Sequence, residues 1–154
     1  EHHGPPARMR GMTRALVPFA FALLATVAQA ADPIEGRWTT FEDGKPRAVV
    51  AIAIENGRAA GRIVAFHPQP GEAANPRCEK CPGALKDRPI VGLAILDVAR
   101  EGGTGPWKGT VIDPDDGDTW RCIVTPDAKG ERLVLRGYVL LPAFGREETW
   151  VRAH

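Results

Sequence analysis

The chain of 154 residues contains no serine, and this absence excludes every catalytic triad built on a serine nucleophile. Beyond residue 30 there are two histidines, His67 and His154, and a cysteine–histidine pair would have to use His67 with no evident third group to orient it. No glycine-rich phosphate loop or dinucleotide fingerprint occurs. The sequence therefore predicts a protein that is not an enzyme and that has no cofactor.

A strong excess of one charge is also missing. Residues 31–154 carry 17 Lys and Arg against 18 Asp and Glu, and the two signs are interspersed without a basic block or an acidic tail. This balance argues against nucleic acid or an anionic membrane surface as the main partner.

The first thirty residues differ from the rest. Arg10 and Arg14 precede the apolar run ALVPFAFALLATV, and the small-residue segment AQA follows. This order is typical of a secretory signal peptide. The apolar run is too short to span a bilayer core of about 30 Å. We expect translation to start at Met9 or Met12 and cleavage to follow Ala30. Residues 1–30 would then be an N-terminal extension and a cleaved leader, and residues 31–154 one periplasmic or secreted domain without membrane insertion.

Short extended runs rich in Val, Ile, Thr and Trp follow the leader, and they predict strands. The predicted strands are 37–41, 47–54, 58–66, 90–96, 107–113, 119–125, 132–140 and 148–152. Turn-forming stretches separate them, among which Asn56-Gly57 is the strongest because both residues tolerate the positive φ of a two-residue hairpin. No run of ten residues beyond the leader has a helical period. The fold class is therefore all-β.

Eight strands joined mostly by tight turns form a meander with two exposed edges. Closing the meander into a single antiparallel up-and-down barrel removes both edges. Runs such as AVVAIAI and IVGLAIL are apolar on both faces, as expected where one face lines a barrel interior and the other packs against a loop. An open sandwich of two sheets is the alternative.

Several motifs together resemble one family. The stretches DGKPRAVVAI, NPRCEKCPG, LRGYV and FGREETWVR extend over nearly all of residues 31–154, and they resemble the uncharacterised bacterial family called domain of unknown function 2147. The resemblance implies a secreted or periplasmic protein with a lipocalin-like β-barrel. It implies no activity.

The stretch GRWTT at the first predicted strand also resembles the opening of lipocalins and fatty-acid-binding proteins. That resemblance implies that Trp38 packs across the closed end of the barrel against an arginine of the last strand. By position, Arg146 or Arg152 would be the partner, in a cation–π contact worth about 0.5–2 kcal/mol.

Cys78 and Cys81 lie in the least strand-like part of the chain, the long connection Pro68–Pro89. A metal site would need two more ligands, and only His67 and Cys122 are available, at no spacing typical of zinc sites. A redox pair would need a helix N-terminus to lower a thiol pKa, and none is predicted. In an oxidising compartment a structural disulfide is the favoured interpretation, and a metal site and a redox pair stay as alternatives. We expect Cys78 to pair with Cys81, although Cys122 stays open as its partner.

Two polar motifs are candidate sites. Arg136 and Tyr138 share one face of a predicted strand by alternation, and fatty-acid-binding proteins use an Arg-x-Tyr pair to hold a carboxylate. Arg62 could add a second cation, while the alternative places all three on the outer surface. The acidic stretch DPDDGD has Asp118 and Val124 where a calcium-binding EF-hand needs glycine and glutamate, so we interpret it as a solvated turn, not a metal site.

The leading functional hypothesis is binding of a small apolar or amphiphilic molecule, with an acidic group as a candidate feature, in the barrel interior. The alternative is an envelope protein–protein interaction module whose barrel is filled by side chains. A third hypothesis is a redox enzyme that cycles Cys78 and Cys81. The sequence leaves the ligand and the oligomeric state open.

Overall fold

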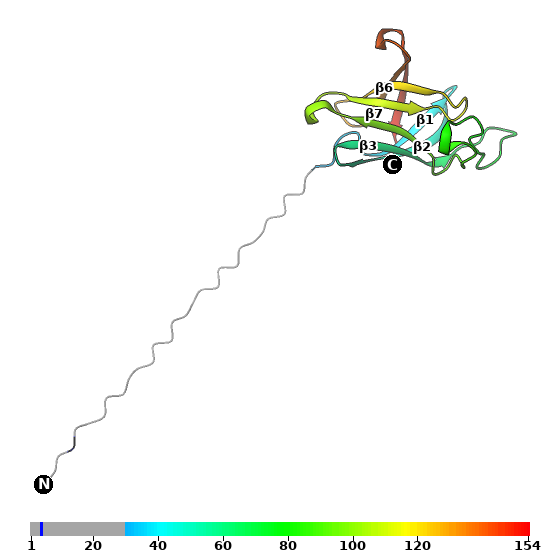
Figure 1. Ribbon diagram of the computed structural model, residues 1–154. Coiled ribbons are helices and arrows are strands. Elements are labelled where there is room, and N and C mark those ends of the chain that lie inside the picture. Colours follow the sequence, from blue (N-terminus) through cyan, green and yellow to red (C-terminus); the bar gives the residue numbers. More distant parts are fainter. Residues whose placement is uncertain (1–3, 5–29) are drawn as a thin grey trace. The chain divides into compact units, whose positions relative to one another are not determined.

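The computed structural model describes residue 4 and residues 30–154, and the described fold is all-β (Figure 1). The predicted leader therefore lies outside the described residues, except for its last residue and Gly4. The strands are β1 (Gly36–Glu42), β2 (Lys45–Glu55), β3 (Arg58–Phe66), β4 (Ala94–Ala99), β5 (Trp107–Ile112), β6 (Thr119–Pro126), β7 (Arg132–Tyr138) and β8 (Arg146–Arg152). Three short 3-10 helices lie in loops: η1 (Gly83–Leu85), η2 (Glu101–Gly103) and η3 (Pro142–Phe144).

The strands close into one antiparallel barrel in sequence order. Each strand pairs with the next along the chain, and β8 returns to β1 through the pairs Trp38 with Arg152 and Thr39 with Val151. Closure removes the free edges of the sheet. The predicted up-and-down barrel is thus confirmed, and the open sandwich is wrong.

One strand prediction was wrong in its bounds. The run 90–96 was expected to be a strand, but β4 begins at Ala94. Ile90 and Leu93 are buried, yet they belong to a loop whose Gly92 has φ 101° and so leaves the strand conformation. Burial of apolar side chains therefore extended the apparent strand into a loop that packs against the barrel.

The up-and-down order sends alternate loops to opposite ends of the barrel. The loops after β1, β3, β5 and β7 lie at one end, which we call the open end, and the loops after β2, β4 and β6 lie at the other, the closed end. Asp43 and Gly44 form the first turn with φ of 49° and 75°, and Asn56 and Gly57 form the second with φ of 51° and 77°. Positive φ at both central residues is the geometry that two-residue hairpins require.

The closed end is sealed by the segment that precedes β1. Ile34 and Trp38 are fully buried, and the Trp38 indole N–H donates to the Ile34 carbonyl at 2.9 Å. The Arg152 guanidinium stacks 4.2 Å from the centre of the Trp38 ring and donates to the carbonyls of Pro33 and Glu35, each at 2.9 Å. These contacts join the segment before β1 to the first and last strands of the barrel and close this end. The interior is therefore accessible from the open end.

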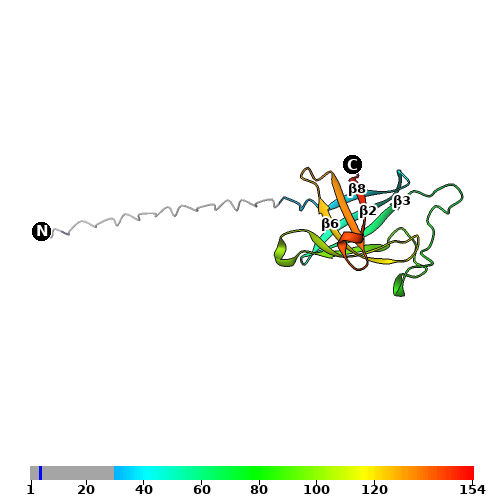
Figure 2. The same cartoon turned by 90° about the horizontal axis from the view of Figure 1, so that it is seen from above.

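The loop between β3 and β4, residues 67–93, is much longer than the other connections (Figure 2). We call it the stapled loop. Its two arms pair with each other, since the Cys78 N–H donates to the Arg88 carbonyl and the Ile90 N–H to the Pro76 carbonyl, at 2.8 and 2.9 Å. The predicted disulfide between Cys78 and Cys81 is confirmed and lies within this loop.

No helix among the described residues is long and apolar enough to cross a membrane.

Candidate functional site: a cavity at the open end of the barrel

A cavity of about 490 Å³ occupies the open half of the barrel. Its inner walls are apolar, and they come from strands on all sides and from the stapled loop: Val50, Ile63, Ile90, Ile95, Val111, Ile112, Leu135, Trp120 and Trp150. Strand alternation explains most of this set, because every second residue of a barrel strand faces inward. The exceptions are Ile90, which lies in the stapled loop, and Ile112, which follows Val111 at the end of β5. Ligand sites in proteins occupy about 300–1,000 Å³ and have mainly apolar linings, so this interior has the size and chemistry of such a site.

Carboxylates dominate the rim of the cavity. Six acidic side chains line it against two arginines, Arg47 and Arg146. The acidic residues come from the β1–β2 turn, the β5–β6 loop and the start of β8: Glu42, Asp43, Asp113, Asp115, Asp116 and Glu148. The rim thus combines residues that are far apart in sequence, and the up-and-down topology is what gathers them at one end.

Arg47 ties three loops of the rim together. Its guanidinium lies 3.1 Å from Glu42, 2.6 Å from Glu72 of the stapled loop and 2.9 Å from Asp115 of the β5–β6 loop. It also lies 4.5 Å from the centre of the Phe66 ring, at the end of β3. The hydrogen bond to Glu72 raises the pKa of Arg47 and lowers that of Glu72. Arg47 therefore stays protonated, and carboxylates of the protein already balance its positive charge.

The stapled loop docks on the β5–β6 loop beside the cavity. The Cys78 sulfur lies 3.3 Å from the Pro114 carbonyl oxygen. Gly117 approaches the Lys80 backbone so closely that a Cβ at Gly117 would collide with the Lys80 carbonyl oxygen. The φ of Gly117 is 79°, a backbone conformation that is costly for other residues. For both reasons only glycine fits at this position. The disulfide thus braces one side of the cavity entrance, and Ile90 of the same loop reaches the cavity wall.

The DPDDGD stretch folds as a tight turn in which two of the carboxylates accept hydrogen bonds from backbone N–H groups. Asp113 accepts the Asp115 N–H at 2.9 Å, and Asp116 accepts the Asp118 N–H at 2.8 Å. Burial raises the pKa of Asp113 above its ordinary value, against the effect of that hydrogen bond, and the nearby charges of Asp116, Asp115 and Asp118 raise it further. The loop therefore concentrates negative charge, and no ion pair among residues 30–154 involves Asp113.

The predicted ligand-binding residues do not line this cavity. Arg136 and Tyr138 lie on the outer face of β7, where Arg136 pairs with Glu147 at 2.8 Å and the Tyr138 ring lies 5.6 Å from the Arg121 guanidinium. Arg62 is exposed on β3 and donates to the Gly92 carbonyl. The inward face of β7 carries Leu133, Leu135 and Gly137 instead. The structure thus does not bring Arg136, Tyr138 and Arg62 together at the cavity.

The two arginines named as partners of Trp38 lie at opposite ends of β8. Arg152 stacks on Trp38 at the closed end, whereas Arg146 is exposed and lines the rim of the cavity. Both face inward by alternation, together with Glu148 and Trp150. Trp150 is buried against the cavity, and its indole N–H donates to Glu148 at 3.3 Å.

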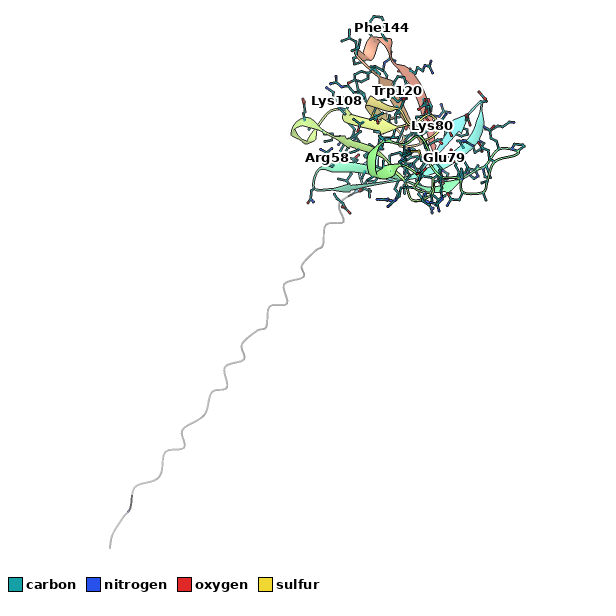
Figure 3. All side chains as sticks on the ribbon, turned by 45° about the vertical axis from the view of Figure 1, so that its right-hand side comes forward. Arg58, Glu79, Lys80, Lys108, Trp120 and Phe144 are labelled. Carbon is teal, nitrogen blue, oxygen red and sulfur yellow. A yellow bond between two sulfur atoms is a disulfide. The ribbon has the colours of Figure 1, made fainter. Side chains whose placement is uncertain are left out.

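The loop between β7 and β8 exposes apolar side chains beside the open end. Phe144 projects at its tip (Figure 3), and its exposed fraction is 84%. Val139, Leu140 and Leu141 are exposed in the same loop.

On β6, Cys122 is buried and unpaired, and burial raises the pKa of its thiol to about 12. Among the described residues, no group of His, Cys, Asp and Glu is arranged to hold a metal ion.

Comparison with solved structures shows the same fold elsewhere. A protein of Helicobacter pylori, HP1028, is 21% identical in sequence and superposes with a TM-score of 0.63, over 78% of this chain and 82% of its own. Its structure is described as belonging to the lipocalin family. At this identity the likeness concerns the fold alone. No curated protein matches the chain.

A family model matches residues 36–152, from the first residue of β1 to the last residue of β8. The chain therefore belongs to the bacterial family described as "Uncharacterized protein conserved in bacteria (DUF2147)".

Proposed function

We propose that this protein binds a small molecule with an apolar part in the cavity at the open end of its barrel. The observation that carries the proposal is the cavity of about 490 Å³ with apolar walls and a charged rim. An apolar ligand would remove these walls from water, which contributes about 25 cal/mol for each Å² of apolar surface buried. The lipocalin-like barrel is compatible with such a role.

The competing interaction-module hypothesis needs a barrel filled by side chains, and the cavity counts against that premise. The redox hypothesis needs accessible thiols, whereas the Cys78 and Cys81 sulfurs are joined and both residues are buried. Ligand binding is the function that uses the hollow interior.

We place the protein in the periplasm or outside the cell. The order of charged, apolar and small residues before Ala30 supports this location, and the disulfide is suited to an oxidising compartment. Mass measurement of the protein exported by a bacterial host tests it, with a mature chain starting at Ala31 as the expected result. A full-length chain that stays in the cytoplasm would contradict the location and leave the binding proposal standing.

Binding is tested by extracting the purified protein for mass spectrometry and by measuring thermal shifts with single-chain amphiphiles. The matched variants are Gly137→Leu and Thr149→Leu. Gly137 faces the cavity, and a Cβ there meets nothing closer than 3.7 Å, so leucine would fill the cavity without a backbone clash. Thr149 is exposed on the outer face of the neighbouring strand.

We expect a co-purified molecule or a thermal shift in the wild type and in Thr149→Leu, and neither in folded Gly137→Leu. An empty wild-type protein without any shift would refute the proposal. An equal shift in Gly137→Leu would show that binding occurs outside the cavity and would refute it as well.

A further inference from the structure

The rim of the cavity carries charge of one sign. Six carboxylates and two guanidiniums leave a formal charge of −4 among the lining residues. Glu42 and Asp115 are paired with Arg47, and Arg47 also holds Glu72. No ion pair of the described residues involves the remaining four carboxylates, which are Asp43, Asp113, Asp116 and Glu148.

These four carboxylates approach the entrance from different sides. Asp43 lies in the β1–β2 turn, Asp113 and Asp116 lie in the β5–β6 loop, and Glu148 lies near the start of β8. A clefted surface lined by charge of one sign concentrates the field and attracts ions of the opposite sign. Below the rim the walls are apolar, and two tryptophan rings, Trp120 and Trp150, face the same space. Aromatic faces also attract cations.

We propose that the ligand is an amphiphile with a cationic head group, held with its apolar part in the cavity and its head among the rim carboxylates. This inference rests on the proposed function, because it names the ligand class of the same cavity. It replaces the acidic ligand that the Arg136 and Tyr138 pair suggested in the sequence, since neither residue lines the cavity.

One residue of the rim argues the other way. Arg146 lines the cavity, is exposed and makes no ion pair within the described part of the chain. An anionic head group would use Arg146, whereas a cationic head group would be repelled by it. Substitution of Arg146 therefore separates the two ligand classes.

The test is isothermal titration calorimetry with decylamine, decanol and decanoate at pH 7, below their micelle concentrations. The three probes share one chain and differ only in the charge of the head. We expect decylamine to bind at least about tenfold more tightly than decanoate, because several partly exposed charge pairs act together. The difference should shrink in high salt, which screens exposed charges.

Variants of the wild-type protein assign the effect to the rim. Asp43→Asn and Asp116→Asn should each weaken decylamine binding about two- to fivefold. The affinity for decanol should stay unchanged in both variants. Asp87→Asn is the matched control, because Asp87 is exposed, has the same left-handed backbone at φ 61° and does not line the cavity. It should bind all probes as the wild type does. Arg146→Gln should strengthen decylamine binding about two- to fivefold.

Equal or tighter binding of decanoate, lost in Arg146→Gln, would overturn the cationic ligand and keep the proposed function. Equal binding of all three probes would also overturn the cationic ligand, because the rim would then not distinguish the charges of the head groups. Binding of none of the three, with no extracted ligand, would instead refute the proposed function itself.

Discussion

Replacing Arg47 by methionine should loosen the open end of the barrel, because one guanidinium holds three loops there. The Arg47 side chain is 11% exposed, and its partners Glu42, Glu72 and Asp115 are 41%, 36% and 50% exposed. Partly exposed ion pairs contribute about 0.2–1 kcal/mol each. The contact with Phe66 adds about 0.5–1 kcal/mol. Together these contacts contribute about 1–4 kcal/mol, and we expect Arg47→Met to lower the free energy of unfolding by about 2–3 kcal/mol, the middle of that range.

The matched control is Arg58→Met at the closed end. Arg58 pairs with Asp97 at 2.7 Å, and both side chains are more than half exposed. That single exposed pair contributes about 0.2–1 kcal/mol at most. Urea denaturation followed by circular dichroism measures both variants. For a barrel of this size, the loss in Arg47→Met corresponds to a fall in Tm of about 6–15 °C.

Acid should reduce the difference between Arg47→Met and the wild type. The pKa of Glu72 is lowered from 4.5, first by its hydrogen bond with Arg47 and then by the Gln69 N–H. Because the folded pKa is lowered, the stabilisation is present above pH 4.5 and is lost as the pH falls through the folded value. The account would be refuted if Arg47→Met stayed within about 0.5 kcal/mol of Arg58→Met at pH 7, or if trypsin cut the stapled loop no faster in Arg47→Met.

Three further substitutions give separate tests. Asp113→Asn should raise Tm at pH 7, because the folded pKa is raised and the ionised carboxyl costs stability there; the gain should vanish below the ordinary pKa of 3.8, as a pH series of melting curves would show. Gly117→Ala should lower Tm and speed proteolysis of the stapled loop, because its Cβ would collide with the Lys80 carbonyl, whereas the same change at the open Gly57 turn should cost less. Phe144→Ser should change the free energy of unfolding by no more than about 0.5 kcal/mol in urea, because its ring is exposed.

The sequence predicted the barrel well because two signals agreed. Turn residues that tolerate positive φ marked the ends of the strands, and runs of β-branched residues marked the strands themselves. For most strands the predicted and observed ranges therefore differ only in their first or last residues. The run 90–96 failed because Ile90 and Leu93 are buried in a loop. Periodicity reports burial, and it cannot distinguish a strand from a loop that packs on one.

The site was predicted less well because alternation defines two faces of a strand without saying which faces inward. On β7 the inward set is Leu133, Leu135 and Gly137, and the outward set includes Arg136 and Tyr138. The contrast of leucines with arginines in RLVLRGY was the available signal, because polar residues of a barrel strand tend to face water. The acidic rim was missed because each turn was interpreted alone. The order of strands places Asp43 and Asp116 at one end, and that placement could have been worked out from the predicted meander.

The most direct test of the central claim is tryptophan fluorescence with decylamine that carries a bromine on its last carbon. Bromine quenches an indole on contact, and two of the four tryptophans, Trp120 and Trp150, line the cavity. Binding in the cavity predicts saturable quenching in the wild type and in Thr149→Leu, and its loss in folded Gly137→Leu. Quenching that persists in Gly137→Leu, or that never saturates in the wild type, would contradict binding in the cavity.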